Sequence, residues 1–193
     1  VVFKISSLTT PTKQLASASA TAIKTFDSSG NIIDSTSDVA TDAITEGALT
    51  GVKRVNSGVD TPAYTDEAVV SFTTAGSVPL GGSIEVSLPA VTSVQAGWVI
   101  ASNATYTFEE PAVSKPVTAS SPSPVVSEQG RNLYFAIGSH AISQDATVVF
   151  KISSLTTPTK QLASASATAI KTFDSSGNII DSTSDVATDA ITE

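Results

Sequence analysis

The chain has 193 residues, of which 40% are hydrophobic and 15% are charged, and it contains neither cysteine nor methionine. Without cysteine it cannot form a disulfide framework, a zinc–thiolate site or a thiol nucleophile. Its net charge of -8, from 10 Lys+Arg against 18 Asp+Glu, argues against nucleic acid as a partner. No apolar run approaches the roughly 18 residues that would predict a membrane span.

Residues 1–46 and residues 148–193 have the same sequence, letter for letter, so the repeat period is 147 residues (148 minus 1). Repeats that are kept only for their fold usually drift apart, because a core tolerates many substitutions of similar volume. Complete identity over 46 positions therefore indicates recent tandem duplication or a nearly uniform array. The chain is expected to be a window of about 1.3 repeats (193 divided by 147) cut from such an array.

The predicted domains are residues 1–46, as the C-terminal part of a preceding repeat, and residues 47–193, as one complete module. Residues 183–193 (TSDVATDAITE) have the composition of a polar linker, and GALTGVKRV after the first copy resembles an opening strand. A unit of residues 1–147 remains an alternative. So does strand sharing between neighbours, since 46 residues with about three strands cannot bury a core alone.

Alternating apolar and polar residues recur along the chain, as is typical of antiparallel strands. In the first copy Val1, Phe3 and Ile5 are predicted to point inward. A strand near 168–173 is expected to meet residues 178–181 across the Asp-Ser-Ser-Gly loop 174–177. The predicted core comprises Phe72, Ile84, Val86, Phe135, Phe150 and Ile152.

Seven or eight such strands in 147 residues predict an all-β fold, an immunoglobulin-like antiparallel β-sandwich in tandem repeats. Four of the nine prolines lie in the stretch 110–124. Because proline removes donors from a strand ladder, this stretch is predicted to be a long surface excursion that covers a sheet edge or offers a contact surface.

The single histidine, His140, lies between two predicted strands, and the chain has no G-x-S-x-G or H-E-x-x-H motif. We therefore expect His140 in an exposed loop and no enzymatic activity. Asn103-Ala104-Thr105 is a possible N-glycosylation site. Five aromatic residues could form a platform for a sugar, but their alternation favours a place in the core: Trp98, Tyr106, Phe108, Tyr134 and Phe135.

The acidic residues of the repeated segment suggest a possible calcium site, because calcium binds carboxylate and carbonyl oxygens. The candidate ligands are Asp181, Asp185 and Asp189, near the end of the module. A hairpin turn followed by a solvated linker explains the same residues without a metal. The complete acidic set is Asp27, Asp34, Asp38, Asp42 and Glu46, repeated as Asp174, Asp181, Asp185, Asp189 and Glu193. No other cofactor is expected.

The strings VSFTTAGSVPLGGSIEVSLP and ATVVFKISSLTTPTK…TFDSSGNIIDS resemble the tandem immunoglobulin-like or E-set-like modules of giant surface and filament proteins, such as long bacterial adhesins and protist surface proteins. The resemblance covers most of residues 47–193 and rests on strand and turn patterning. It implies a β-sandwich array with a structural or adhesive role, and it implies no catalytic residues.

The sequence thus predicts a structural protein, an extended extracellular filament, stalk or sheath whose partners are neighbouring copies of the same repeat. The alternative is a cell-surface adhesin whose repeats present a ligand or calcium site. Arrays of near-identical modules are typical of proteins that span distance or display surface.

Overall fold

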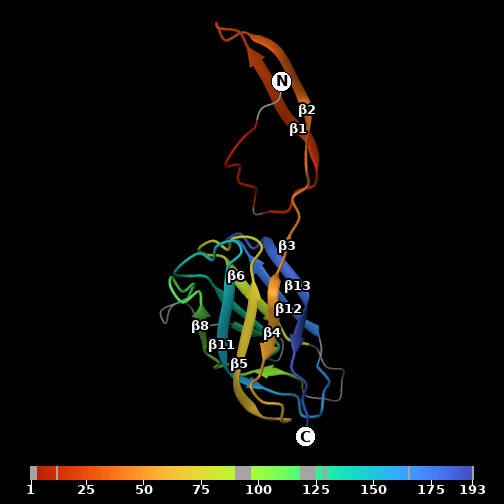
Figure 1. Cartoon of the computed structure of the whole chain (residues 1–193), viewed down its shortest axis with the longest axis vertical. Coiled ribbons are helices and arrows are strands. Elements are labelled where there is room, and N and C mark those ends of the chain that lie inside the picture. Colours follow the sequence, from red (N-terminus) through yellow and green to blue (C-terminus); the bar gives the residue numbers. More distant parts are fainter. Residues whose placement is uncertain are drawn as a thin grey trace. The chain divides into compact units, whose positions relative to one another are not determined.

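The computed structural model describes residues 4–11, 13–89, 97–117, 125–127, 130–164 and 166–192. These residues form thirteen β-strands and no α-helix, so the predicted all-β class is confirmed. No helix in the described part of the chain is long and apolar enough to cross a membrane. The chain divides into two compact units, Val1–Glu46 and Gly47–Glu193, which we call unit 1 and unit 2 (Figure 1).

Unit 1 contains one antiparallel hairpin, β1 (Ala18–Phe26) and β2 (Ile32–Thr41). The turn is fixed by Asp27, whose Oδ1 accepts hydrogen bonds from the backbone N–H groups of Ser29 (2.9 Å) and Asn31 (2.8 Å). The Asn31 side-chain amide also donates to Asp27, which holds the pKa of Asp27 below its ordinary value. Gly30 supplies the positive φ of 84° that the turn requires.

The predicted inward-facing strand at the start of unit 1 is wrong for the residues described there. Residues 4–11 form no strand, and the Ile5 side chain is 64% exposed. Val1 and Phe3 lie outside the described residues. The physical reason is the lack of a neighbouring strand, because the equivalent Ile152 is paired on both sides by strands of residues 47–147.

Unit 2 is built around one large sheet with the strand order β7-β11-β5-β4-β13-β12-β6-β10-β9, while β3 also pairs with β13 and β8 with β11. The strands are β3 (Gly47–Ala48), β4 (Thr50–Asn56), β5 (Thr65–Thr73), β6 (Ser83–Ser87), β7 (Val99–Ile100), β8 (Tyr106–Glu110), β9 (Val125–Ser127), β10 (Asn132–Ala136), β11 (Thr147–Thr156), β12 (Ser166–Phe173) and β13 (Ile179–Thr188).

This sheet curls until its two ends face each other, which makes it nearly closed and barrel-like. Phe108 on β8 meets Phe135 on β10 edge to face, with 5.6 Å between the ring centroids. Phe135 meets Phe150 on β11 in the same way at 5.1 Å. Such aromatic pairs add to the stabilisation from burial alone. The expected antiparallel pairing is wrong for one strand, because β13 runs parallel to β3 and β4.

The predicted core is confirmed: all six of its residues are at most 1% exposed and belong to one apolar cluster, namely Phe72, Ile84, Val86, Phe135, Phe150 and Ile152. Trp98 and Phe108 are buried too, as the alternation predicted. Tyr134 is the exception at 43% exposed. Its neighbours Leu133 and Phe135 point inward, so the period of two turns Tyr134 outward.

The polar run 183–193 is not a linker, and this expectation is corrected by the structure. Its first residues belong to β13, and the side chains of Val186, Thr188 and Ile191 are at most 2% exposed. Ile191 also exchanges backbone hydrogen bonds with Leu162. The run lacks the apolar alternation of a strand because one of these three buried positions, Thr188, carries a small polar side chain.

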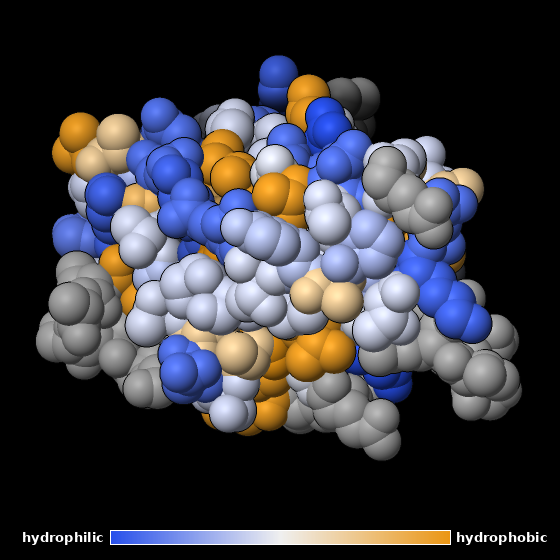
Figure 2. Space-filling model, turned by 90° about the horizontal axis from the view of Figure 1, so that it is seen from below, coloured by the Kyte–Doolittle hydropathy of each residue, from blue (hydrophilic) through white to orange (hydrophobic). Residues whose placement is uncertain are grey.

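The proline-rich stretch 110–124 leaves the sheet after β8, and its residues 118–124 lie outside the described residues. Residues 111–117 form no strand, with Val113 82% exposed and Val117 buried. The Pro116 carbonyl accepts hydrogen bonds from the N–H groups of Gly138 and Ser139. The described part is therefore an irregular excursion held against the loop that follows β10. Seen from below, unit 2 has small hydrophobic areas scattered among polar ones (Figure 2).

Truncating the buried side chain of Phe150 to a methyl group tests the core. We expect Phe150→Ala to lower the free energy of unfolding by about 3–5 kcal/mol, because the cavity forfeits the contacts to Phe108 and Phe135. Val113→Ala, at an exposed position, is the control and should change it by less than about 0.5 kcal/mol. Chemical denaturation measures both, and a loss under about 1 kcal/mol for Phe150→Ala would contradict this core.

Candidate functional site: the interface that receives the repeated segment

The second copy of the repeated segment supplies three strands to unit 2. We call residues 148–193 the insertion segment and residues 47–147 the acceptor. Within the sheet, β11 lies between β5 on one side and β7 and β8 on the other, while β12 and β13 lie between β6 and β4. Without them, the described acceptor strands keep only the pairings of β4 with β5 and of β10 with β6 and β9. The sheet is continuous only when the insertion segment is in place.

The same sequence has two very different environments in the two copies. Ile152 and Leu155 are each 1% exposed, whereas the equivalent Ile5 and Leu8 are 64% and 78% exposed. Ile170 in β12 is fully buried, and its equivalent in β1, Ile23, is 39% exposed. Burying one such side chain stabilises a fold by about 1.5–3 kcal/mol. The acceptor is thus what removes the apolar face of the segment from water.

The hairpin of the segment is nevertheless the same in both copies. Ile23 pairs with Thr36 in β1–β2, and Ile170 pairs with Thr183 in β12–β13, 147 positions later. Asp174 accepts hydrogen bonds from the loop N–H groups of Ser176 and Asn178 at 2.8 Å, as Asp27 does in the first copy. The expectation that both copies form the same strands is therefore correct for the hairpin, whereas β11 has no counterpart among the described residues of unit 1.

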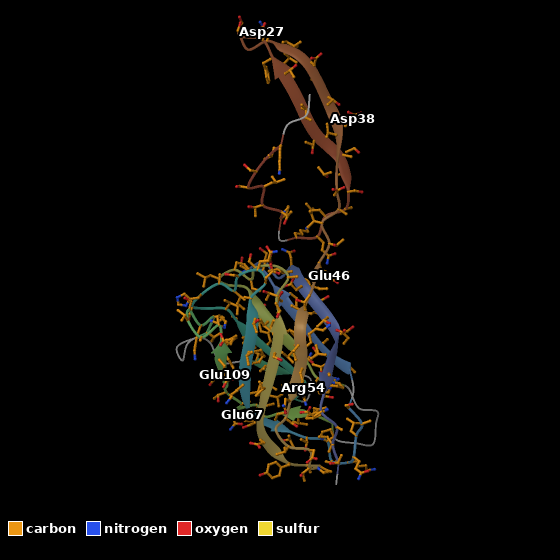
Figure 3. All side chains as sticks on the ribbon, viewed as in Figure 1. Asp27, Asp38, Glu46, Arg54, Glu67 and Glu109 are labelled. Atoms are coloured by element: carbon orange, nitrogen blue, oxygen red, sulfur yellow. The ribbon has the colours of Figure 1, made fainter. Side chains whose placement is uncertain are left out.

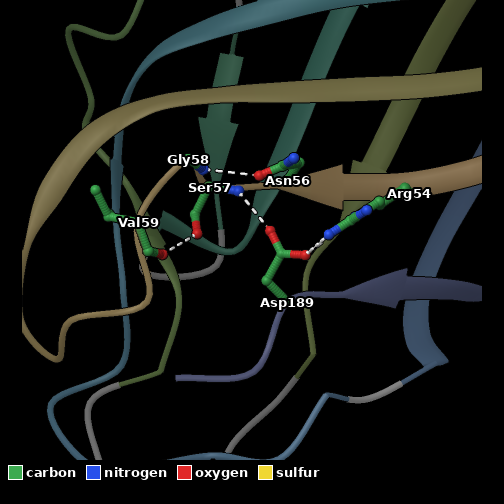
Figure 4. A network of polar contacts seen from close by, with 6 residues as sticks. All are labelled: Arg54, Asn56, Ser57, Gly58, Val59 and Asp189. Carbon is green, nitrogen blue, oxygen red and sulfur yellow. Dashed lines mark hydrogen bonds and ion pairs between the residues drawn. The ribbon is translucent and has the colours of Figure 1, made fainter. Parts of the chain in front are cut away.

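Two basic residues of β4 meet two aspartates of the insertion segment. Lys53 Nζ lies 2.6 Å from Asp185 Oδ1, and Arg54 forms an ion pair with Asp189. Figure 4 shows that the second oxygen of Asp189 accepts the backbone N–H of Ser57, at 3.2 Å. The hydrogen bond from Lys53, together with that from Thr183, holds the pKa of Asp185 below its ordinary value. These contacts fix the register of β13 along β4.

A third basic residue, Lys151 in the middle of β11, connects the strands on its two sides. Its Nζ lies 2.9 Å from Glu67 Oε1 on β5 and 3.0 Å from Glu109 Oε1 on β8, and Figure 3 shows both carboxylates on the same unit. The hydrogen bonds that Lys151 donates to Glu67 and Glu109 raise the pKa of Lys151. One ammonium group therefore joins β5 and β8 through the strand inserted between them.

Asp181 occupies a closed slot at the start of β13. Its Oδ1 accepts the backbone N–H of Gly76 at 2.9 Å, and its Oδ2 accepts the Thr172 hydroxyl at 3.1 Å. A side chain on Gly47 would overlap Asp181, and a Cβ on Gly76 would lie 2.5 Å from Ile180 Cγ2. Glycine is required at both positions for the backbone to approach. Burial raises the pKa of Asp181 above its ordinary value.

The three calcium candidates, Asp181, Asp185 and Asp189, are separated by these different partners. Asp181 is buried between backbone and hydroxyl donors, while Asp185 and Asp189 each neutralise a basic residue. The described part of the chain contains no group of three acidic, histidine or cysteine side chains that could hold a metal ion. Glu193 lies outside the described residues. Calcium binding stays a prediction of the sequence.

The remaining candidates lie on the surface. Asn103 is exposed in the turn between β7 and β8, and glycosylation there stays a prediction. His140 is exposed in a loop, as expected, with Nδ1 3.2 Å from the Lys115 carbonyl oxygen. Sequence reasoning missed Lys53, Arg54 and Lys151. A signal for the first two was present in the sequence, because Lys53 and Arg54 are adjacent in a chain with only 10 Lys+Arg.

Comparison with family models, with curated proteins and with solved structures gives no significant match for this chain.

The two copies provide a matched test of the acceptor's contribution. We expect Leu155→Ala to lower the free energy of unfolding in dilute solution by about 2–5 kcal/mol, because Leu155 is buried by the acceptor. Leu8→Ala removes the same side chain from the same local sequence, and should cost less than about 0.5 kcal/mol. Equal losses for the two variants in urea denaturation would show that the acceptor is not what buries this leucine.

The two shifted aspartates of β13 predict opposite pH dependence. The pKa of Asp181 is raised by burial, so its contribution to stability falls as pH rises from the unfolded-state pKa through the folded-state pKa. The pKa of Asp185 is lowered, so its contribution is present above the unfolded-state pKa and is lost as pH falls through the folded-state pKa. Carboxyl-carbon NMR should find Asp181 titrating at higher pH than Asp185. The reverse order would contradict the environments described.

Proposed function

We propose that the chain belongs to a structural tandem-repeat protein in which immunoglobulin-like β-sandwich modules of 147 residues build an extended filament, stalk or sheath outside the cell. In this proposal its partners are neighbouring copies of the same repeat. The observation that carries the proposal is the role of the repeated segment: its second copy contributes three strands to unit 2. The repeated segment is therefore a part that a module of this kind needs to complete its sheet.

The path of the chain through unit 2 supports an extended array. Because β13 runs parallel to β3 and β4, Gly47 lies beside Asp181, whereas Thr188 lies beside Val55. Seven residues of strand separate Asp181 from Thr188, which at 3.3 Å per residue is roughly 23 Å. Beyond them, the Thr192 N–H donates to the Asp60 carbonyl. The chain thus enters unit 2 at one end and leaves it at the other, and each further module adds length.

The connection between repeats is short. In the first copy Ile44 exchanges backbone hydrogen bonds with Leu15, and Gly47 already pairs with β13 of unit 2. Only Thr45 and Glu46 separate these two pairings. A flexible joint needs a longer run of glycine and serine, so successive modules are expected to bend little. The net charge of residues 47–193 is -6 (7 Lys+Arg against 13 Asp+Glu), which opposes unspecific side-by-side association.

Small-angle scattering tests the array. Proteins that contain one, two and three consecutive copies of residues 47–193 should show a maximum dimension that grows by a constant increment, because the chain enters and leaves at opposite ends. The profile should be that of a single elongated body. The profile of freely jointed bodies, or a dimension that does not grow with copy number, would contradict the proposal.

A further inference from the structure

We infer that residues 1–46 are a strand-donating arm whose partner is the acceptor, residues 47–147, of another copy, and that this arm cannot complete the acceptor to which it is directly joined. The proposed array supplies the setting, since it brings copies of the repeat together. The inference names the surface through which they join.

The arm is prepared for insertion. Its hairpin has the pairing of β12–β13, and its turn has the same hydrogen bonds. What it lacks is cover for its apolar side chains, which stay exposed: Ile5 64%, Leu8 78%, Ile23 39%, Phe26 56%, Ile32 53% and Ile33 63%. A hairpin by itself is marginally stable in water. The exposed face of unit 1 is thus a preformed interaction surface.

Unit 2 shows what covers this surface, because the identical sequence is already seated there. Insertion into another acceptor would place Asp38 and Asp42 at the positions of Asp185 and Asp189, against that acceptor's Lys53 and Arg54. In unit 1 the described residues provide no ion pair for Asp38 or Asp42.

The slot beside Gly47 and Gly76 would receive Asp34, the equivalent of Asp181. The arm therefore matches the acceptor in charge and shape as well as in hydrophobicity.

Connectivity excludes the acceptor that follows the arm directly. Seated there, Asp34 would lie beside Gly47, as Asp181 does, and Thr45 would lie beside Asp60, as Thr192 does. Glu46 would then be more than about 20 Å of strand away from Gly47. The peptide bond that joins Glu46 to Gly47 spans only about 3.8 Å between Cα atoms. The arm must therefore use an acceptor upstream in the chain or in another molecule.

Capture between molecules joins them head to tail, because the arm of one chain fills the acceptor of the next. Such contacts are heterologous and join the molecules into closed rings or open chains. In the chain of 193 residues each acceptor is already filled by its own residues 148–193, so capture requires that this copy be disabled.

The test uses the whole chain and disables one copy at a time. In Ile152→Asp/Ile170→Asp, two unpaired charges would be buried, so residues 148–193 can no longer insert. We expect this variant to keep a cooperative thermal transition and the wild-type β-sheet circular dichroism, and to sediment with a mass at least about twice that of the wild type. The matched variant Ile5→Asp/Ile23→Asp changes the same residues in the arm and should remain a folded monomer.

Each other outcome overturns the inference. An unfolded Ile152→Asp/Ile170→Asp chain would show that the arm does not complete another acceptor. A folded monomer would show that the arm completes its own acceptor. The variant with all four substitutions should lose the cooperative transition, and folded oligomers of it would show that assembly does not use the arm. These results do not depend on how the scattering dimension grows with copy number, so the capture and the array can fail separately.

Discussion

The insertion of β11 between β5 and β8 is the contact on which the rest of unit 2 depends. Its backbone pairs on both sides, its apolar residues join the aromatic cluster of Phe108, Phe135 and Phe150, and Lys151 bridges carboxylates of both neighbouring strands. Remove it and β8 has no described partner in the sheet. A strand from the last third of the chain thus holds together strands that precede it by up to 91 positions (Thr156 pairs with Thr65), which makes the stability of this unit strongly non-local.

The two copies of the repeated segment separate what local sequence determines from what the surroundings determine. The hairpin and its Asp-Ser-Ser-Gly turn form in both, because their hydrogen bonds lie within the segment. Among the described residues, the strand at its beginning forms only in the second copy, where β5 and β8 are available. Alternation at Ile5 and Ile152 is identical, yet one side chain is exposed and the other buried. Alternation of apolar and polar residues therefore indicates that a segment can pair as a strand. Whether it does so depends on the presence of a neighbouring strand.

This distinction explains how far the sequence could be used for prediction. The all-β class, the six core residues and the hairpin loop follow from periodicity and turn chemistry, which are local. The strand order does not, because parallel pairing of β13 with β3 and β4 joins residues more than 130 positions apart. Residues 183–193 were misjudged for a related reason: Thr188 is buried beside Val55 with little apolar surface of its own. The partners of Lys53 and Arg54 could be identified only once that register was known.

Identical copies in one chain create a problem that connectivity resolves. Tandem repeats are prone to exchange strands during folding, and here the two copies offer an acceptor the same side chains. Sequence differences cannot direct the choice, because there are none. The parallel run of β13 beside β3 and β4 places the end of the segment far from the start of the acceptor, so a segment can fill the acceptor that precedes it and not the one that follows. Topology, not side-chain variation, fixes which copy completes which module.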